Sequence, residues 1–190
     1  MIGDKKKINE QKGFTLIEVL VSVFIFSLIV GGIANALLTT ISLQKTISAE
    51  QKMMAEVSYV LEYMSRSLRM AQKASNGDCL TEKNNYEAVS NGVKFLNYDG
   101  KCQEFFIDNT TKTIKQRISS DSKSINFSSS IALTSNNVQV EKLIFNNAGS
   151  SWSSPANNQS KITINLEIKP TSADYSRKFQ TTVSQRRLNI

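Results

Sequence analysis

The 190-residue sequence contains no histidine, which removes the most common general base and the most common metal ligand of proteins. A Ser-His-Asp triad is therefore excluded, and the chain also has no nucleophile elbow and no glycine-rich phosphate loop. Only two cysteines occur, Cys79 and Cys102, so a cysteine-based metal site has no histidine to complete it. These absences predict a protein that is not an enzyme and that needs no metal or other cofactor.

Charge is also missing from one long stretch, because no charged residue occurs between Val19 and Gln44. Over the whole chain, 23 basic and 16 acidic residues give a formal charge of +7. In the part of the chain that follows the apolar stretch the basic residues are scattered, a pattern typical of a solvated surface, and nucleic acid is not indicated as a partner.

Fourteen of the twenty residues from Phe14 to Ile33 are Phe, Leu, Ile or Val. A helix of this length is about 30 Å long, enough to cross the hydrocarbon core of a bilayer. Lysines precede the run, which predicts a cytoplasmic N-terminus. A secretory signal peptide cleaved near Gly31–Ala36, a plain signal anchor and a third class of leader all remain compatible with this pattern.

The residues directly before the apolar run favour the third class. Residues 12–18 read KGFTLIE, which resembles the class III leader of type IV prepilins and type II secretion pseudopilins. The resemblance implies that a prepilin peptidase cuts between Gly13 and Phe14, removes residues 1–13 as a leader, and leaves Phe14 to be N-methylated. It also implies that Glu18 pairs with the Phe14 ammonium of a neighbouring subunit.

One departure from the family concerns proline, which many type IV pilins carry about twenty residues into the mature helix. This chain has Gly31, Gly32 and Asn35 there and no proline before Pro155. Two glycines weaken a helix by about 1 kcal/mol each, and they could equally allow close helix packing.

Helical periodicity continues after the apolar run. An apolar stripe with three-four spacing predicts an amphipathic helix that ends near Ser75, where Asn76-Gly77 is a stop signal. We assign residues 14–44 to the transmembrane helix and its exit and residues 45–75 to the amphipathic half. Packing on the chain's own sheet is favoured over a short coiled coil. The stripe consists of Ile47, Met54, Val57, Leu61, Met64 and Leu68.

Residues 76–190 form the predicted extracytoplasmic β domain. Asp99-Gly100 is a hairpin signal, and clear two-residue alternation occurs at Lys161–Lys169. The predicted strands are 93–98, 103–107, 113–118, 138–145, 161–169 and 179–183. The fold class is therefore α+β, with a long N-terminal helix packed on an antiparallel sheet, which again resembles pilins. In an oxidising exterior, Cys79 and Cys102 are expected to form a disulfide, and two buried free thiols are the alternative.

The ending from Phe179 to Arg186 resembles that of minor pilins and J-type pseudopilins. The resemblance implies a structural or priming subunit of a type IV pilus, type II secretion or competence filament. Its partners would be the prepilin peptidase, other pilin or pseudopilin subunits through the N-terminal helix, the inner-membrane assembly platform and the lipid bilayer. It would sit in the bacterial cytoplasmic membrane as a single-pass protein before entering the filament. The alternative function is a membrane-anchored binding module with a contact surface around Trp152.

Overall fold

The structure is a computed structural model that divides the chain into two compact units, Met1–Lys45 and Thr46–Ile190. The leader residues 1–12, the helix stop at Asn76-Gly77 and the loop around Trp152 lie outside the described residues. The residues described are 13–74, 79–80, 84–121, 126–147, 159–172 and 174–186.

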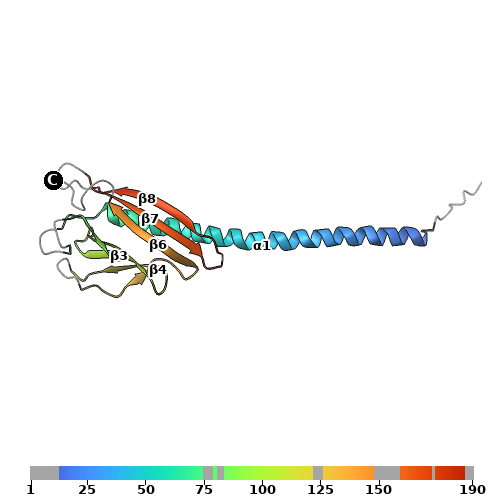
Figure 1. Ribbon diagram of the computed structural model, residues 1–190, viewed down its shortest axis with the longest axis horizontal. Helices are drawn as coiled ribbons and strands as arrows, with labels where there is room; N and C mark the ends of the chain where they lie inside the picture. The colour runs from blue at the N-terminus through green and yellow to red at the C-terminus, as the bar shows by residue number, and fades with distance from the viewer. Residues whose placement is uncertain are drawn as a thin grey trace, which may run out of the picture. The chain divides into compact units, whose positions relative to one another are not determined.

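A single helix, α1 (Leu16–Arg69), contains 54 residues and provides the described structure of the first unit from Leu16 onward (Figure 1). Large apolar side chains of this stretch are exposed on every side of the helix, from 79% at Leu16 to 47% at Val30. The most apolar window of α1 has a mean hydropathy of 2.5 and no buried residue. Such a helix has the length and composition to cross a membrane.

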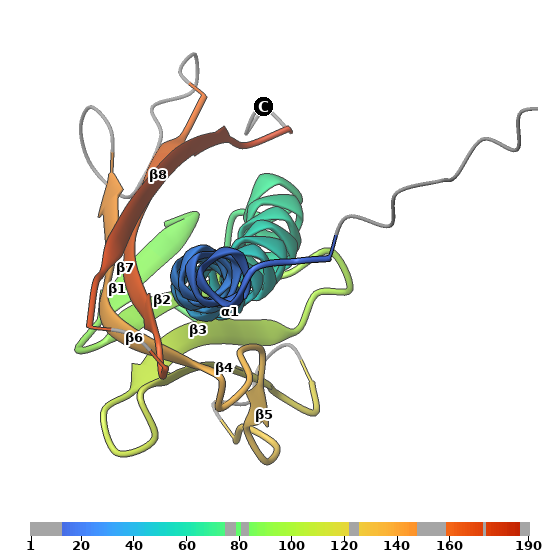
Figure 2. The same cartoon turned by 90° about the vertical axis from the view of Figure 1, so that its right-hand side faces the viewer.

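The second unit contains two antiparallel sheets, which Figure 2 shows in a view along α1. The first sheet has the order β1-β2-β3-β4-β5 and the second has the order β6-β7-β8. Gly100, with φ of 72°, supplies the left-handed position in the turn between β2 and β3. The strands are β1 (Tyr86–Val89), β2 (Gly92–Leu96), β3 (Cys102–Asp108), β4 (Thr113–Ile118), β5 (Ile131–Ala132), β6 (Val138–Asn147), β7 (Lys161–Pro170) and β8 (Arg177–Ser184).

The part of α1 that belongs to the second unit shares one hydrophobic core with both sheets. Its buried side chains follow spacings of three and four residues, as expected for one face of a helix. Two predicted stripe members are wrong, because Ile47 is 52% exposed and Met54 is 37% exposed. The buried residues of α1 are Met53, Val57, Val60, Met64 and Leu68.

The predicted α+β class, a long N-terminal helix with antiparallel strands, is confirmed, and the layout is consistent with a pilin-like fold. The strands form two sheets, however, where the sequence suggested one. At the start of β6, Val140 donates its backbone N–H to the Lys112 carbonyl in the β3–β4 turn. The β6–β7 register then shifts between Val140 and Lys142, and β6 continues along β7.

The helix ends at Arg69, earlier than the predicted end near Ser75. The backbone leaves the helix because it finds partners near the first sheet. Gln72 donates its N–H to the Leu96 carbonyl at 2.9 Å, and Ala74 donates to the Asn84 carbonyl at 3.1 Å. Tertiary pairing therefore ends α1 before the Gly77 stop signal.

Candidate functional site

The candidate site is the start of α1, where the predicted cleavage bond lies. Gly13, Phe14 and Thr15 are exposed and precede the helix, which begins at Leu16. A Cβ placed on Gly13 would meet no atom within 4 Å. The Gly13–Phe14 bond is therefore outside the helix, and no described residue of this chain obstructs it, as a peptidase substrate requires.

Glu18 takes part in a capping box with Thr15. The Thr15 N–H donates to Glu18 Oε2 at 3.3 Å, and the Glu18 N–H donates to Thr15 Oγ1 at 3.4 Å. The Thr15 hydroxyl also reaches Glu18 Oε2 at 3.4 Å. Thr15 is thus the N-cap of α1, a role that we did not assign from the sequence although the T-x-x-E spacing signals it.

The capping box holds the Glu18 carboxylate back toward the N-terminal end of α1, next to the residue that follows Phe14. Negative charge is favourable there, because the first N–H groups of a helix carry partial positive charge. Glu18 remains exposed, so its carboxylate oxygens can still accept hydrogen bonds from a cation. Glu18 is the acidic residue in the first turn of α1, and the next charged residue of the helix is Lys45.

This geometry coincides with a known sequence family. Residues 8–34 match the family model of the prokaryotic N-terminal methylation motif. The motif includes Gly13, Phe14 and Glu18 together with the first apolar turns of α1, so the resemblance to a type IV prepilin-like leader is confirmed. No curated protein and no solved structure matches the chain.

The methylation motif supports a type IV pilin-like protein that is processed as a prepilin and then associates with other pilins. Together with the exposed apolar helix, it indicates membrane anchoring. The match ends at residue 34, so the β domain lies outside it.

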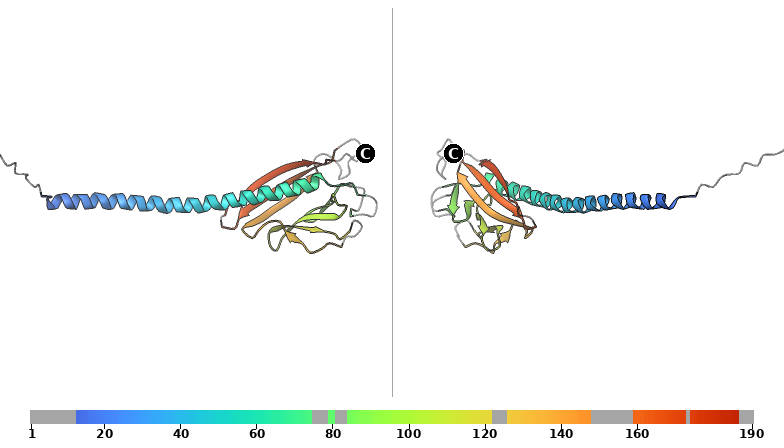
Figure 3. Two further views of the ribbon diagram at one scale, coloured as in Figure 1. Left: turned by 180° about the vertical axis from the view of Figure 1, so that it is seen from behind. Right: turned by 45° about the vertical axis from the view of Figure 1, so that its right-hand side comes forward.

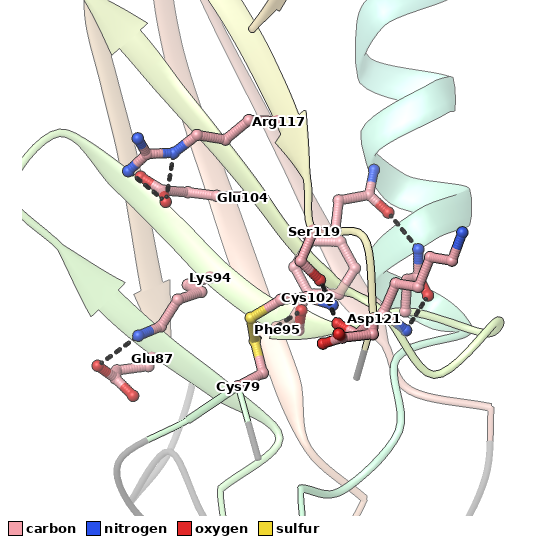
Figure 4. The surroundings of a disulfide bond; sticks show 12 residues. Cys79, Glu87, Lys94, Phe95, Cys102, Glu104, Arg117, Ser119 and Asp121 are labelled. Atoms are coloured by element: carbon pink, nitrogen blue, oxygen red, sulfur yellow. Dashed lines mark hydrogen bonds and ion pairs between the residues drawn. A yellow bond between two sulfur atoms is a disulfide. The ribbon is translucent and has the colours of Figure 1, made fainter. Parts of the chain in front are cut away.

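Away from this site, the structure joins Cys79 to Cys102 by a disulfide with Cα atoms 5.2 Å apart (Figure 4). Both residues are nearly inaccessible, at 2% and 0% exposure. They belong to a second apolar cluster with Ala74, Leu80 and Leu96, against which Phe127 packs. The bridge therefore ties the segment that follows α1 to the start of β3.

A row of charges of alternating sign crosses the first sheet, and we did not predict it from the sequence. Glu87, Lys94, Glu104 and Arg117 are successive register partners on β1, β2, β3 and β4. Lys94 lies 3.1 Å from Glu87, and Arg117 lies 2.8 Å from Glu104 (Figure 4). Cross-strand pairs of opposite charge stabilise sheet register, which gives this row a structural role.

The last described residues of the chain are anchored beside the end of α1. Gln185 is 1% exposed and donates its side-chain amide to the Ala71 carbonyl at 2.7 Å. Its side-chain oxygen accepts a hydrogen bond from Asn85 at 2.8 Å.

In the described part of the chain, no group of three or more His, Cys, Asp or Glu residues could hold a metal ion.

Proposed function

We propose that this protein is a membrane-anchored minor pilin or pseudopilin that serves as a structural or priming subunit of a type IV pilus-type filament. One observation carries the proposal, namely a methylation motif that continues into an apolar helix exposed on all sides. An unpartnered helix of this kind needs lipid or other helices around it, and a filament subunit uses the two environments in turn. The role is structural, without catalysis.

In this proposal the short N-terminus stays in the cytoplasm, α1 spans the membrane once, and the β domain lies outside. The lysines of the leader favour this orientation. The disulfide between Cys79 and Cys102 supports an oxidising environment for the β domain. The prepilin peptidase, the inner-membrane assembly platform and like subunits are the proposed partners.

Glu18 gives the assembled state its specificity. A carboxylate in a dry helix bundle needs a partner, and the free ammonium of a trimmed Phe14 on a neighbouring subunit provides one. Such a pair mainly fixes register, because the desolvation cost offsets much of the Coulomb attraction. The capping box leaves the carboxylate exposed at the end of the helix where that ammonium would lie.

The test compares Glu18→Gln and Glu18→Ala with the unchanged chain in cells that make the filament. Glutamine at this position can still cap the helix, so it removes the charge while keeping the local structure. We expect both variants to be trimmed normally but to be depleted about tenfold from filaments sheared off the cells, the loss that corresponds to about 1.4 kcal/mol.

Ser22→Ala provides the matched control, since Ser22 lies one turn further on, is exposed, and bonds only its own helix at the Glu18 carbonyl. This variant should enter filaments as the unchanged chain does. Normal incorporation of Glu18→Gln would refute the charge-pair role, and absence of the unchanged chain from sheared filaments would refute the proposed function itself.

A further inference from the structure

The bond that the leader resemblance marks for cleavage joins the Gly13 carbonyl to the Phe14 nitrogen. Both residues precede α1, whose ribbon begins at Leu16 (Figure 3). Among the described residues, no hydrogen bond involves the backbone of Gly13 or Phe14. A peptidase attacks the carbonyl carbon of the bond that it cuts and pairs with the backbone beside it, so it needs these groups free of helical hydrogen bonds.

The start of α1 lies directly after this bond, so the exact residue at which the helix begins matters for cleavage. Each helical N–H donates to the carbonyl four residues earlier. In a helix that began one residue earlier, the Glu18 N–H would bond the Phe14 carbonyl. One further residue would let the Ile17 N–H bond the Gly13 carbonyl, which is the group that the peptidase attacks. A small shift in the start of α1 would therefore withdraw the bond from the enzyme.

Thr15 determines where α1 begins. Its carbonyl accepts the N–H of Val19 at 3.3 Å and that of Glu18 at 3.1 Å. Its hydroxyl oxygen accepts the same Glu18 N–H at 3.4 Å. This N–H is the donor that would otherwise bond the Phe14 carbonyl, so Thr15 competes directly with extension of the helix toward the leader. Because the bond uses the backbone of Glu18, a substitution of the Glu18 side chain leaves it in place.

We propose that Thr15 is a positioning residue for prepilin processing, which holds the Gly13–Phe14 bond outside the helix so that the peptidase can bind it. The inference rests on the proposed function, because it requires a peptidase that cuts this bond. Thr15 acts through the start of α1 and not through the reacting atoms. Residue type matters for such a role, since threonine is a good N-cap, whereas valine and alanine are poor N-caps.

Two substitutions separate capping from direct recognition of the Thr15 side chain by the peptidase. Thr15→Val keeps the branched shape of the side chain and removes the oxygen that caps the helix. Thr15→Asn changes the shape and keeps a capping oxygen, and asparagine is at least as good an N-cap as threonine. Ser22→Ala is the matched control, because it removes a hydroxyl that donates to the Glu18 carbonyl within α1 and takes no part in the cap.

The experiment measures initial rates of cleavage of the full-length chain by a prepilin peptidase in detergent micelles, over a range of substrate concentrations. The peptidase binds only the fraction of chains whose bond is free, so loss of the cap should raise KM and leave kcat unchanged. We expect Thr15→Val to raise KM about fivefold, which corresponds to about 1 kcal/mol. Thr15→Asn and Ser22→Ala should be cut as the unchanged chain is.

A second measurement reports on the bond itself in the uncut chain. The dipeptide Gly-Phe occurs once in the sequence, so labelling glycine carbonyls with carbon-13 and phenylalanine with nitrogen-15 gives one doubly labelled signal, that of Gly13–Phe14. Its carbonyl chemical shift should move toward the helical value in Thr15→Val and stay unchanged in Thr15→Asn.

The inference and the proposed function fail in different ways. If the unchanged chain is cut and Thr15→Val has the same KM, or if the carbonyl shift of Thr15→Val does not move, the positioning role is overturned and processing stands. Equal losses for Thr15→Asn and Thr15→Val also overturn it, because the peptidase then recognises the threonine side chain itself. Failure of the peptidase to cut the unchanged chain contradicts the proposed function.

Discussion

Removal of the disulfide should destabilise the β domain by an amount that follows from its place in the chain. Cys79 and Cys102 are separated by 23 positions, and closing a loop of that length restricts the unfolded chain by about 3 kcal/mol at 25 °C in the chain-entropy account. We therefore expect the double variant Cys79→Ala/Cys102→Ala to lose about 3 kcal/mol of unfolding free energy. Replacing both residues avoids an unpaired thiol.

The measurement is urea unfolding of the full-length chain in detergent micelles, followed by the near-ultraviolet circular dichroism of its tyrosines. For an m value of about 2 kcal/mol/M, the midpoint should fall by about 1.5 M. Reduced wild-type protein is the matched control, because it loses the crosslink and keeps the sulfur atoms that pack beside Leu80 and Leu96. A loss below about 1 kcal/mol in both samples would refute the chain-entropy reasoning.

Three further predictions concern the core and its ionisable groups. Met64→Ala should cost about 2–5 kcal/mol in urea unfolding, whereas Met54→Ala should cost less than about 1 kcal/mol, because Met64 is 0% exposed and Met54 is 37% exposed. Tyr86→Phe should cost about 1 kcal/mol, because it removes a buried hydrogen bond to the Leu68 carbonyl. Burial raises the pKa of this phenol, so the wild type should lose more stability than Tyr86→Phe as the pH rises above about 10. The Lys115 ammonium holds the pKa of the Asp108 carboxyl below its usual range, so wild-type stability should fall as the pH drops below about 4, and Asp108→Asn should flatten that fall in an acid titration followed by circular dichroism. Equal losses for the two methionine variants, or pH profiles unchanged by either of the other substitutions, would contradict these assignments.

Sequence reasoning was strongest where the pattern is long and local. The leader resemblance and the apolar run need no tertiary information, because both are written in consecutive residues from Lys12 to Ile33. The α+β class also followed from periodicity, which changes from helical spacing to alternation after residue 91. Within the amphipathic half, the stripe was correct at Val57, Met64 and Leu68.

The sequence-based predictions are wrong at positions where tertiary contacts determine burial or the bounds of an element. Met53 is buried and Met54 is exposed. Two adjacent methionines have the same hydrophobicity, so the sequence does not show which of them is buried, and the position of the sheets determines it. The short strand β1 has four residues and was missed, since it exists through its pairing with β2. The early end of α1 depends on the bond from Gln72 to Leu96, which no local signal reveals. The cap at Thr15, in contrast, was readable from its spacing to Glu18.

The most direct test of the central claim is the mass of the chain after production together with a prepilin peptidase. The account predicts the loss of residues 1–13 and a methylated N-terminus at Phe14. Gly13→Val serves as the control, because no described residue of this chain lies close enough to oppose a larger side chain there, so a block of cleavage would report on recognition by the peptidase. An unchanged mass for the wild-type chain would contradict processing as a prepilin and would leave a plain membrane anchor, whereas a trimmed and methylated chain, with Gly13→Val uncut, is the result that the account predicts.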